Sequence, residues 1–372
     1  IIVIHNRGSG RSSMKKRVGI TGQAGFFGYH LANCLARHAD QIELIPFQDD
    51  FFKDEVRLTA FAQQCDAIVH LAAMNRTSGD QKEIYECNIG LVKQLLSVLV
   101  RNDLRPQILF SSSIQEERDN YYGRSKKDGR ALFHKWAVEN DSRFVGLIIP
   151  NVFGAFGVPF YNSAVATFCH QLTHNLEPKI EVDAVVKLVY INDLVETVYT
   201  TICEGVNNSS LYIQPIAEIK VSEILKTLTA FKSSYLDQNI IPALSTNFDL
   251  SLFNTFRSYL DRDYYPIHLE LRSDNRGYLF EIIKSPNGGQ SFFSFTKPGI
   301  TRGNHYHTRK IERFCVVQGE AEIRLRKVGS LDNKVIVYTV NVNNPAVVDI
   351  PIFYTHNITN IGSKDLATHF WS

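Results

Sequence analysis

The chain has 372 residues, of which 44% are hydrophobic and 21% are charged, and its formal net charge is +2. This length predicts two domains rather than one, and the ordinary composition is sufficient for a sizeable core. The near-neutral charge, without any basic block, argues against a nucleic-acid partner.

Cysteine usage and hydropathy predict a cytoplasmic protein with no membrane insertion. The six cysteines are scattered singly, with no CxxC pair, and we interpret them as buried, reduced thiols. No apolar run approaches the roughly 20 residues that a membrane-spanning helix needs. Residues 1–13 include a linker-like segment and are interpreted as a tag or upstream sequence, with Met14 as the natural start.

The first motif in the chain is a strand, a glycine turn and a helix. An apolar strand at 18–21 is followed by glycines at positions 22, 25 and 28 and by an amphipathic helix from His30 to Arg37. This order is typical of a dinucleotide site, because the glycines allow the backbone to approach a pyrophosphate at the N-terminus of the helix.

Further elements follow at the spacing of a doubly wound fold. We expect strands at 42–47, 67–73 and 107–113, with a helix at 84–100 between the last two. Nearly continuous apolar strands that alternate with helices predict an α/β Rossmann-like parallel sheet covered on both faces.

Residues able to transfer a proton follow the third of these strands. Ser111, Ser112 and Ser113 end the strand, and Tyr122 and Lys126 lie four residues apart at the start of the next helix, on one helix face. An ammonium beside a phenol is expected to lower the pKa of Tyr122 towards neutrality. The tyrosine could then pass a proton to a carbonyl oxygen that a serine hydroxyl polarises.

Residues 17 to about 250 resemble the extended short-chain dehydrogenases/reductases of the nucleotide-sugar type. The resemblance rests on the glycine motif, His70–Ala73, Asn88, the serine-ended strand, Tyr122 with Lys126, Pro150–Gly154 and Tyr190–Asp193. It implies that Ser113, Tyr122 and Lys126 are catalytic and that Asn151 and Asn162 lie near the sugar nucleotide. The expected cofactor-binding residues are Gly22, Gly25, Phe26, Phe27, Gly28, Asp50, Leu71, Ala72, Ala73, Asn88, Ser111, Tyr122 and Lys126.

Two positions depart from this family pattern. Ile148 and Ile149 occupy a stretch where family members often carry an arginine before the Pro-Asn pair. The second strand ends without an acidic residue directly at its end and without an arginine to hold a 2′-phosphate. NADP(H) is therefore expected from the resemblance, and Asp50 or Phe51 is expected to line the adenine.

The middle of the chain predicts helices but no chemistry. Amphipathic patterns indicate one helix at 221–231 and a second at 240–259. We expect the reductase domain to span residues 14–257 and a second domain to span 258–372.

The second domain combines short strands with four possible metal ligands. Strands expected at 278–283, 291–296, 314–318, 320–327, 334–340 and 346–350 predict a sandwich or barrel. His305 and His307 alternate onto one face of a strand, which Glu312 and His356 can reach from other strands. Three imidazoles and a carboxylate suit Zn²⁺, Fe²⁺, Mn²⁺ or Ni²⁺, and Zn²⁺ is the expected ion.

These ligands lie in two motifs that resemble those of the cupin family, which implies an all-β jelly roll. Phe353 departs from the pattern, since a glycine is usual there. The segments Asp274–Gly277 and Arg302–His305 also resemble cupin epimerases of 4-keto-6-deoxysugars. That resemblance implies that Arg276 and Arg302 bind substrate phosphates and that His305 is the base, but the full ligand set favours His305 as a ligand and leaves the base unidentified.

Beyond Met14 the chain resembles CapF-type bifunctional enzymes of capsule and O-antigen synthesis. The resemblance implies that the cupin epimerises C3 of a UDP-2-acetamido-2,6-dideoxy-4-hexulose, a UDP-linked 4-keto-6-deoxy amino sugar. The reductase would then reduce C4 with NADPH to the 6-deoxy-L-talose derivative, on the path to UDP-N-acetyl-L-fucosamine. It also implies a homodimer or larger assembly and a shortened last strand, because the chain ends at Ser372.

Two other functions remain open at this point. The first domain is alternatively an NAD-dependent 4-epimerase or dehydratase, joined to a cupin whose metal is structural. Dehydratases usually carry an Asp-Glu pair after the serine-ended strand, whereas Ile114 and Gln115 stand there and Glu116 and Glu117 come later. The other function is that of a catalytically silent sugar-nucleotide sensor, against which the intact Ser113, Tyr122 and Lys126 argue.

Overall fold

The computed structural model describes residues 14–261, 264, 267, 269–284, 289–307, 310, 312–328, 334–351 and 354–372. The chain divides into two compact units. The first comprises the residues up to Leu228 together with Thr246–Tyr259, and the second comprises Thr229–Ser245 together with Leu260–Ser372. Phe353, singled out in the sequence, lies outside the described residues.

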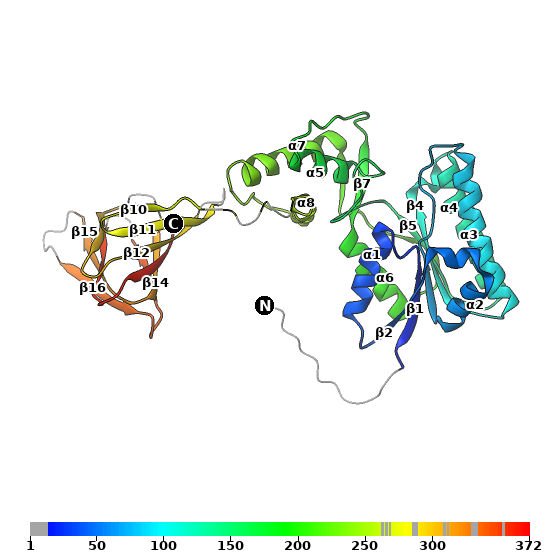
Figure 1. Ribbon diagram of the computed structural model, residues 1–372, viewed down its shortest axis with the longest axis horizontal. Helices are drawn as coiled ribbons and strands as arrows, with labels where there is room; N and C mark the ends of the chain where they lie inside the picture. Colours follow the sequence, from blue (N-terminus) through cyan, green and yellow to red (C-terminus); the bar gives the residue numbers. More distant parts are fainter. Residues whose placement is uncertain are drawn as a thin grey trace. The chain divides into compact units, whose positions relative to one another are not determined.

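A six-stranded parallel sheet is the centre of the first unit (Figure 1). Its strands, in spatial order, are β2 (Ile42–Ile45), β1 (Lys16–Thr21), β3 (Ala67–His70), β4 (Gln107–Ser113), β5 (Phe144–Ile149) and β8 (Asn208–Tyr212). The direction of winding reverses between β1 and β3, which are paired neighbours. In open α/β sheets, ligands bind at such a switch point, beyond the carboxyl ends of the strands.

Helices cover both faces of this sheet, as the sequence pattern predicts. The helices α1 (Phe26–Arg37) and α6 (Ile191–Glu204) pack on one face around a core that includes Val18, Leu35 and Val198. On the other face lie α2 (Glu55–Gln64), α3 (Lys82–Arg101) and α4 (Tyr121–Glu139), in a core rich in aromatic residues. Both sets of buried side chains come from nearly continuous apolar strands, which is the pattern expected of a parallel sheet.

A smaller substructure completes the first unit. A three-stranded sheet contains β6 (Asn151–Phe153), β7 (Val185–Tyr190) and β9 (Ala217–Lys220), accompanied by α5 (Ala164–Thr173), α7 (Val221–Phe231) and α8 (Asn247–Arg257). Short helical segments of the first unit are η1 (Asp49–Lys53) and η2 (Ile114–Glu117). Helix α7 continues past Leu228 into the second unit, to which η3 (Lys232–Leu236) belongs.

Several elements differ in length from the sequence predictions. Helix α8 begins at Asn247 instead of residue 240, because Thr246 and Asp249 form a capping box there. Strand β2 ends at Ile45, before Pro46, and β3 ends at His70, so that residues 71–73 form a loop over the sheet. Helix α1 begins four residues earlier than predicted, at Phe26, directly after the glycine turn.

The second unit contains two antiparallel sheets that share one core. One sheet has the order β10 (Arg272–Asp274), β11 (Gly277–Lys284), β12 (Gln290–Thr296), β19 (Leu366–Trp371), β14 (Glu312–Gln318) and β17 (Val347–Ile350). The other has the order β13 (Thr301–His305), β18 (Tyr354–Asn360), β15 (Glu320–Lys327) and β16 (Val335–Asn341). Apolar side chains of both sheets, including Phe314, Ile323 and Phe370, meet in the core. The predicted all-β second fold is therefore confirmed.

Strand β19 is a central strand of the larger sheet. It pairs with β12 on one side and with β14 on the other. It spans six residues and is paired along both edges.

The six cysteines are all free thiols. Cys34, Cys65 and Cys169 are buried as predicted, whereas Cys203 is exposed. In the described part of the chain, no helix is both long enough and apolar enough to span a membrane.

Candidate functional site

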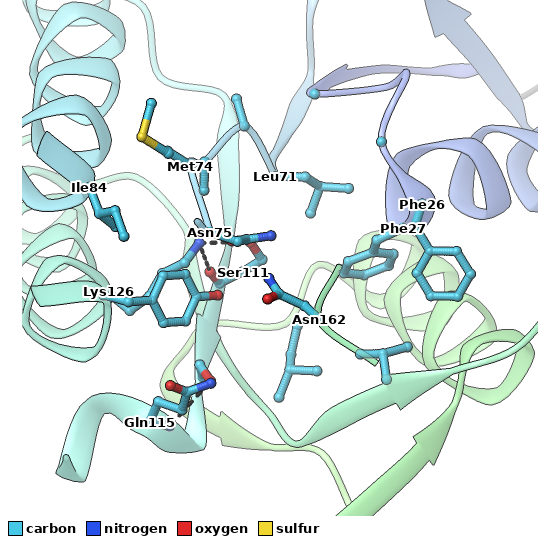
Figure 2. A pocket seen from close by; sticks show the side chains of 18 of the residues that line it. Phe26, Phe27, Leu71, Met74, Asn75, Ile84, Ser111, Gln115, Lys126 and Asn162 are labelled. Carbon is cyan, nitrogen blue, oxygen red and sulfur yellow. Dashed lines mark hydrogen bonds between the residues drawn. The ribbon is translucent and has the colours of Figure 1, made fainter. Parts of the chain in front are cut away.

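A cavity of about 1300 Å³ lies in the first unit, at the carboxyl ends of the parallel strands. Its wall includes the glycine turn after β1, residues 71–75 after β3 and the serine-ended strand β4. Figure 2 shows Ser111 and Lys126 across the cavity from Phe26 and Phe27, with Asn162 between the two sides. The switch point of the sheet is thus a concave site of sufficient size for a dinucleotide.

The glycine turn is closely packed against its surroundings. Gly22 has a φ of 72°, and a Cβ atom on this residue would lie 2.8 Å from the backbone nitrogen of Ala72. A Cβ atom on Gly28 would lie 2.3 Å from the carbonyl oxygen of Gly22. Gly25 is the N-cap of α1 and has no side chain to cap the first-turn N–H groups. These groups, with the positive end of the helix dipole, are suited to bind phosphates.

Buried polar contacts hold the two walls of the switch point together. The Thr21 hydroxyl lies 2.9 Å from Nδ1 of His70 and accepts a 3.3 Å hydrogen bond from the Ala72 backbone. The Asn88 side chain accepts a 2.6 Å hydrogen bond from the backbone nitrogen of Met74 and donates a 3.1 Å hydrogen bond to the carbonyl oxygen of the same residue. It also donates a hydrogen bond to the hydroxyl of Ser125. Asn88, predicted to bind cofactor, therefore orders the loop that lines the cavity without lining it itself.

Lys126 is buried beside the serine-ended strand. Its ammonium donates a 2.9 Å hydrogen bond to the carbonyl oxygen of Ser111 and lies 5.6 Å from the centroid of the Tyr122 ring. Burial lowers the pKa of Lys126 to about 8, against a counter-effect of the negative charge of Glu116.

The pKa of Tyr122 shifts in the direction opposite to the prediction. Burial, reinforced by Tyr161, raises it to about 12. The predicted lowering of this pKa is therefore wrong. Lys126 is hydrogen-bonded to Ser111 and is itself desolvated, so its charge does not outweigh the removal of the phenol from water.

The third predicted catalytic residue, Ser113, also lines the cavity. Its hydroxyl caps η2 by accepting a 3.2 Å hydrogen bond from the backbone nitrogen of Gln115. Ser113, Tyr122 and Lys126 are therefore brought to one cavity, as the sequence pattern predicts.

Most of the other predicted residues line the same cavity. These are Gly22, Gly25, Phe26, Phe27, Gly28, Leu71, Ala72, Ala73, Ser111, Asn151 and Asn162. Asp50 is not part of the lining; its carboxylate accepts a 2.7 Å hydrogen bond from Arg57, and Asp49 lines the cavity instead.

Arg57 is a residue that the sequence pattern did not reveal. The end of β2 itself carries no arginine, but α2 brings the Arg57 guanidinium to Gln48 and Asp50, 4.4 Å from the Phe51 ring centroid. The cavity lining also includes Met74, Asn75, Gln115, Arg124 and Tyr161, which were not predicted. Of these residues, only Gln115 could have been identified from the sequence, because it closely follows the serine-ended strand.

The four predicted metal ligands form a cluster in the second unit. One ligand atom from each of His305, His307, Glu312 and His356 lies within 4.8 Å of every other. The Glu312 carboxylate is 3.1 Å from Nε2 of His307 and 3.0 Å from Nε2 of His356. His305 lies opposite His356 in the pairing of β13 with β18.

His307 reaches this cluster differently from the prediction. Strand β13 ends at His305, so the two histidines do not share one strand. A bulge after Gly303, with Asn304 at a φ of 66°, turns the chain at this point.

The electrostatics of the cluster fit a divalent cation. Burial alone would raise the pKa of Glu312, but the hydrogen bond from His356 and the charges of Lys310, His356 and His307 lower it to about 2. Burial and the neighbouring His356 lower the pKa of His305, which favours the neutral imidazole with a free lone pair. Three histidine nitrogens and a carboxylate are a donor set that suits zinc, and these residues therefore fit the group.

The two predicted substrate-binding arginines lie in the second unit as well. Arg276 forms an exposed ion pair with Asp274. Arg302 donates a 3.0 Å hydrogen bond to the hydroxyl of Thr296 on β12, and burial with the nearby Arg276 lowers its pKa.

Two family models match the chain. The NAD dependent epimerase/dehydratase family matches residues 18–211, and the polysaccharide biosynthesis C-terminal domain matches residues 272–372. A UDP-2-acetamido-2,6-beta-L-arabino-hexul-4-ose reductase of Pseudomonas aeruginosa is 32% identical over 359 residues, which cover 96% of this chain and 94% of the relative.

Solved structures agree with these matches. The capsular polysaccharide assembling protein CapF of Staphylococcus aureus has a TM-score of 0.83 and 34% identity, with 95% of each chain covered. RMD of Pseudomonas aeruginosa shares the fold of the first unit, at 17% identity and a TM-score of 0.56, with 66% of this chain and 99% of that one covered. The chain is therefore a CapF homologue, a member of the NAD dependent epimerase/dehydratase family that carries a polysaccharide biosynthesis C-terminal domain.

Proposed function

We propose that the chain is a UDP-sugar biosynthetic oxidoreductase that reduces the C4 ketone of a UDP-2-acetamido-2,6-dideoxy-hexulose with NADPH. The observation that carries this proposal is the meeting of Ser113, Tyr122 and Lys126 with the glycine turn in one cavity. The name of the Pseudomonas aeruginosa relative, a hexul-4-ose reductase, supports the substrate class.

The side chains of the cavity have suitable protonation states for such a reduction. NADPH, when bound, supplies the hydride. Tyr122, with its pKa raised to about 12, keeps its proton at neutral pH and can donate it to the developing alkoxide. Lys126 can stabilise the resulting phenolate, and the Ser113 hydroxyl can donate a hydrogen bond to the same substrate oxygen.

The position of the acidic residues after β4 argues against the dehydratase alternative. Gln115 lines the cavity, whereas Glu116 is bound to Ser112 and Arg130. A side-chain amide cannot serve as the general acid that dehydration needs. The 4-epimerase and the silent sensor remain outcomes of the experiment below.

For the second unit we propose a metal-dependent cupin that epimerises C3 of the same 4-keto sugar before its reduction. The ion would be held by His305, His307, Glu312 and His356, and zinc suits this set. A bound divalent cation supplies positive charge next to the 4-keto oxygen and so acidifies the C3 proton. Arg276 and Arg302, which are near each other, would bind the diphosphate of the substrate.

The proposed domains are the reductase at 14–257 and the cupin at 258–372. The product would be UDP-2-acetamido-2,6-dideoxy-L-talose, on the path to UDP-N-acetyl-L-fucosamine for capsule or O-antigen. We expect a cytoplasmic homodimer or larger homo-oligomer, as the resemblance to CapF-type enzymes implies.

Oxidation of NADPH in D₂O tests both activities at once. The wild-type chain, Tyr122→Phe and His305→Ala are incubated with a UDP-4-keto-6-deoxy-N-acetylhexosamine, and NADPH and NADH are compared. Tyr199→Phe and His369→Ala serve as matched controls, since Tyr199 does not line the cavity and His369 lies outside the four-ligand cluster.

Each outcome identifies a function. Loss of NADPH oxidation in Tyr122→Phe, with deuterium at C3 of the product only while His305 is intact, supports the two-step proposal. A sugar altered at C3 alone, without NADPH oxidation, supports the cupin step and contradicts the proposed reduction, whereas alteration elsewhere without net cofactor oxidation indicates a 4-epimerase or dehydratase. An unaltered sugar and unused NADPH contradict the proposed substrate class and favour the sensor.

A further inference from the structure

A largely buried ion pair lies directly behind the reductase cavity. Arg130 of α4 binds Glu116 of η2 through both carboxylate oxygens, with Nε 2.9 Å from Oε1 and Nη2 2.7 Å from Oε2. Only 23% of the Arg130 side chain and 9% of the Glu116 side chain are exposed. The same carboxylate accepts a hydrogen bond from the hydroxyl of Ser112.

Gly146 makes room for this arginine. A Cβ atom on Gly146 of β5 would lie 2.6 Å from Cδ of Arg130. The guanidinium extends past this residue to β8, where Nη1 donates to the carbonyl oxygen of Ser209 (3.0 Å) and the hydroxyl of Ser210 (2.8 Å). Arg130 thus connects η2 and α4 with β8 at the edge of the sheet.

The ion pair lies between the parts that carry the catalytic side chains. In the sequence, Ser112 lies between Ser111, whose carbonyl oxygen accepts a hydrogen bond from Lys126, and Ser113, which lines the cavity. On α4, Tyr122, Lys126 and Arg130 follow one another at intervals of four residues and so share one face of the helix.

The first turn of α4 is also in close contact with η2. A Cβ atom on Gly123 would lie 2.1 Å from the carbonyl oxygen of Gln115. A displacement of η2 therefore moves either the serine end of β4 or the start of α4, on which Tyr122 lies.

We propose that Glu116 is a positioning residue for reduction: held by Arg130, it fixes the serine end of β4 against α4 and provides a negative counter-charge for the buried Lys126. The inference rests on the proposed function and deepens it. It explains why an acidic residue follows the serine-ended strand here without facing the cavity.

The surroundings of Lys126 agree with this role. Its ammonium lies 5.2 Å from the Phe110 ring centroid and 5.6 Å from that of Tyr122, and His70 from β3 is electrostatically coupled to it. His70 is buried, and burial with the charge of Lys126 lowers its pKa to about 3, so it is neutral. Glu116 is the acidic group that opposes the desolvation of Lys126.

The test compares Glu116→Gln with Glu117→Gln, an exposed carboxylate one position later on the same short helix. A double variant, Glu116→Gln with Arg130→Met, removes both charges of the pair. For each protein we would measure the pH profile of kcat/KM for NADPH oxidation, the pH dependence of NADP⁺ affinity and the thermal unfolding temperature. Glu116→Asp tests rescue by the conservative variant.

The expected results distinguish a positioning role of Glu116 from a purely structural one. Glu116→Gln removes the counter-charge of Lys126. The part of the pH profile in which Lys126 loses its proton, called here the limb, then moves to lower pH by about half a unit or more, both for kcat/KM and for NADP⁺ affinity. The double variant recovers unfolding temperature, because it leaves no unpaired buried charge, and its limb lies between those of the wild type and Glu116→Gln, because the repelling charge of Arg130 is removed as well. Glu116→Asp restores part of kcat.

Two results would overturn the proposal. One is a Glu116→Gln profile identical to that of Glu117→Gln, and the other is a limb that moves to higher pH in Glu116→Gln. NADP⁺ affinity reports on Lys126 even if the wild-type chain reduces no sugar. A failure of the proposed function, with no NADPH oxidised by the wild type, is therefore distinguishable from a failure of this inference.

Discussion

The ammonium of Lys126 lies 5.6 Å from the ring centroid of Tyr122, one helical turn away, and yet the pKa of the tyrosine is raised rather than lowered. Both groups are desolvated in the same cavity wall, and each then resists its charged form. The site therefore holds a protonated phenol beside an ammonium that is easily deprotonated, so that Tyr122 has a proton to donate.

Lys126 is expected to reduce the stability of the fold at neutral pH. The pKa of Lys126 in the folded chain, about 8, is below the ordinary 10.5. The resulting loss of folding stability is therefore fully present below pH 8 and disappears as the pH rises to 10.5. Lys126→Met should therefore raise the free energy of unfolding by up to about 3 kcal/mol at pH 7 and by little at pH 10.5, while abolishing reduction. Urea unfolding at both pH values measures this, with the exposed Lys127→Met as the control; an equal effect at both pH values would contradict it.

The glycine turn should not tolerate a side chain at Gly28. The added Cβ of Gly28→Ala would meet the backbone of Gly22 and Gln23, which must then move. We expect this movement to lower the free energy of unfolding by on the order of 1–3 kcal/mol. We expect at least tenfold weaker NADPH binding in a fluorescence titration. Gly90→Ala in α3 is the control, since nothing lies within 4 Å of its Cβ position, and alanine should stabilise that helix by about 0.5–1 kcal/mol.

Arg57 is expected to favour NADPH over NADH. Its exposed guanidinium lies at the end of β2, where a 2′-phosphate is usually recognised, and carries the positive charge that the strand end itself lacks. Arg57→Ala should weaken NADPH binding about fivefold, equivalent to about 1 kcal/mol, and leave NADH binding unchanged. Calorimetric titration with each cofactor decides this. The nearby exposed Lys53→Ala serves as the control, and an equal loss for both cofactors would refute the role.

Metal removal should destabilise the second unit. An ion at 100 times its Kd stabilises the folded state by about 2.7 kcal/mol, so a chelator should lower the unfolding temperature of the wild-type chain, and added Zn²⁺ should restore it. His356→Ala removes a buried ligand and should show neither effect. Elemental analysis of both purified proteins provides the second readout. A wild-type chain with no more bound metal than His356→Ala would argue against the site, and His369→Ala should behave as the wild type.

Much of the site was predictable because its signals are local in the chain. The glycine turn is followed at once by its helix, and Tyr122 and Lys126 are four residues apart on one helix, so their placement depends on backbone geometry within a single turn. The cluster of His305, His307, Glu312 and His356 was predictable for another reason. Three histidines and a glutamate at these spacings match a zinc donor set, which needs its members close together.

The order of the parallel strands and the directions of several side chains were decided by tertiary structure. Arg57 reaches the end of β2 from α2, and Glu116 turns away from the cavity because Arg130, fourteen residues later, binds it. The sequence pattern pointed to Glu116 but not to its partner Arg130, and it did not point to Arg57.

What the sequence by itself determined was the order of the two folds, the glycine turn, the Ser113, Tyr122 and Lys126 set and the four residues of the candidate metal cluster. Only the tertiary structure decided the sign of the Tyr122 pKa shift, the pairing of Asp50 with Arg57 and the position of His307 beyond its strand. The physical reason is that desolvation and charge pairing depend on all the atoms packed around a group, and most of those atoms come from distant parts of the chain.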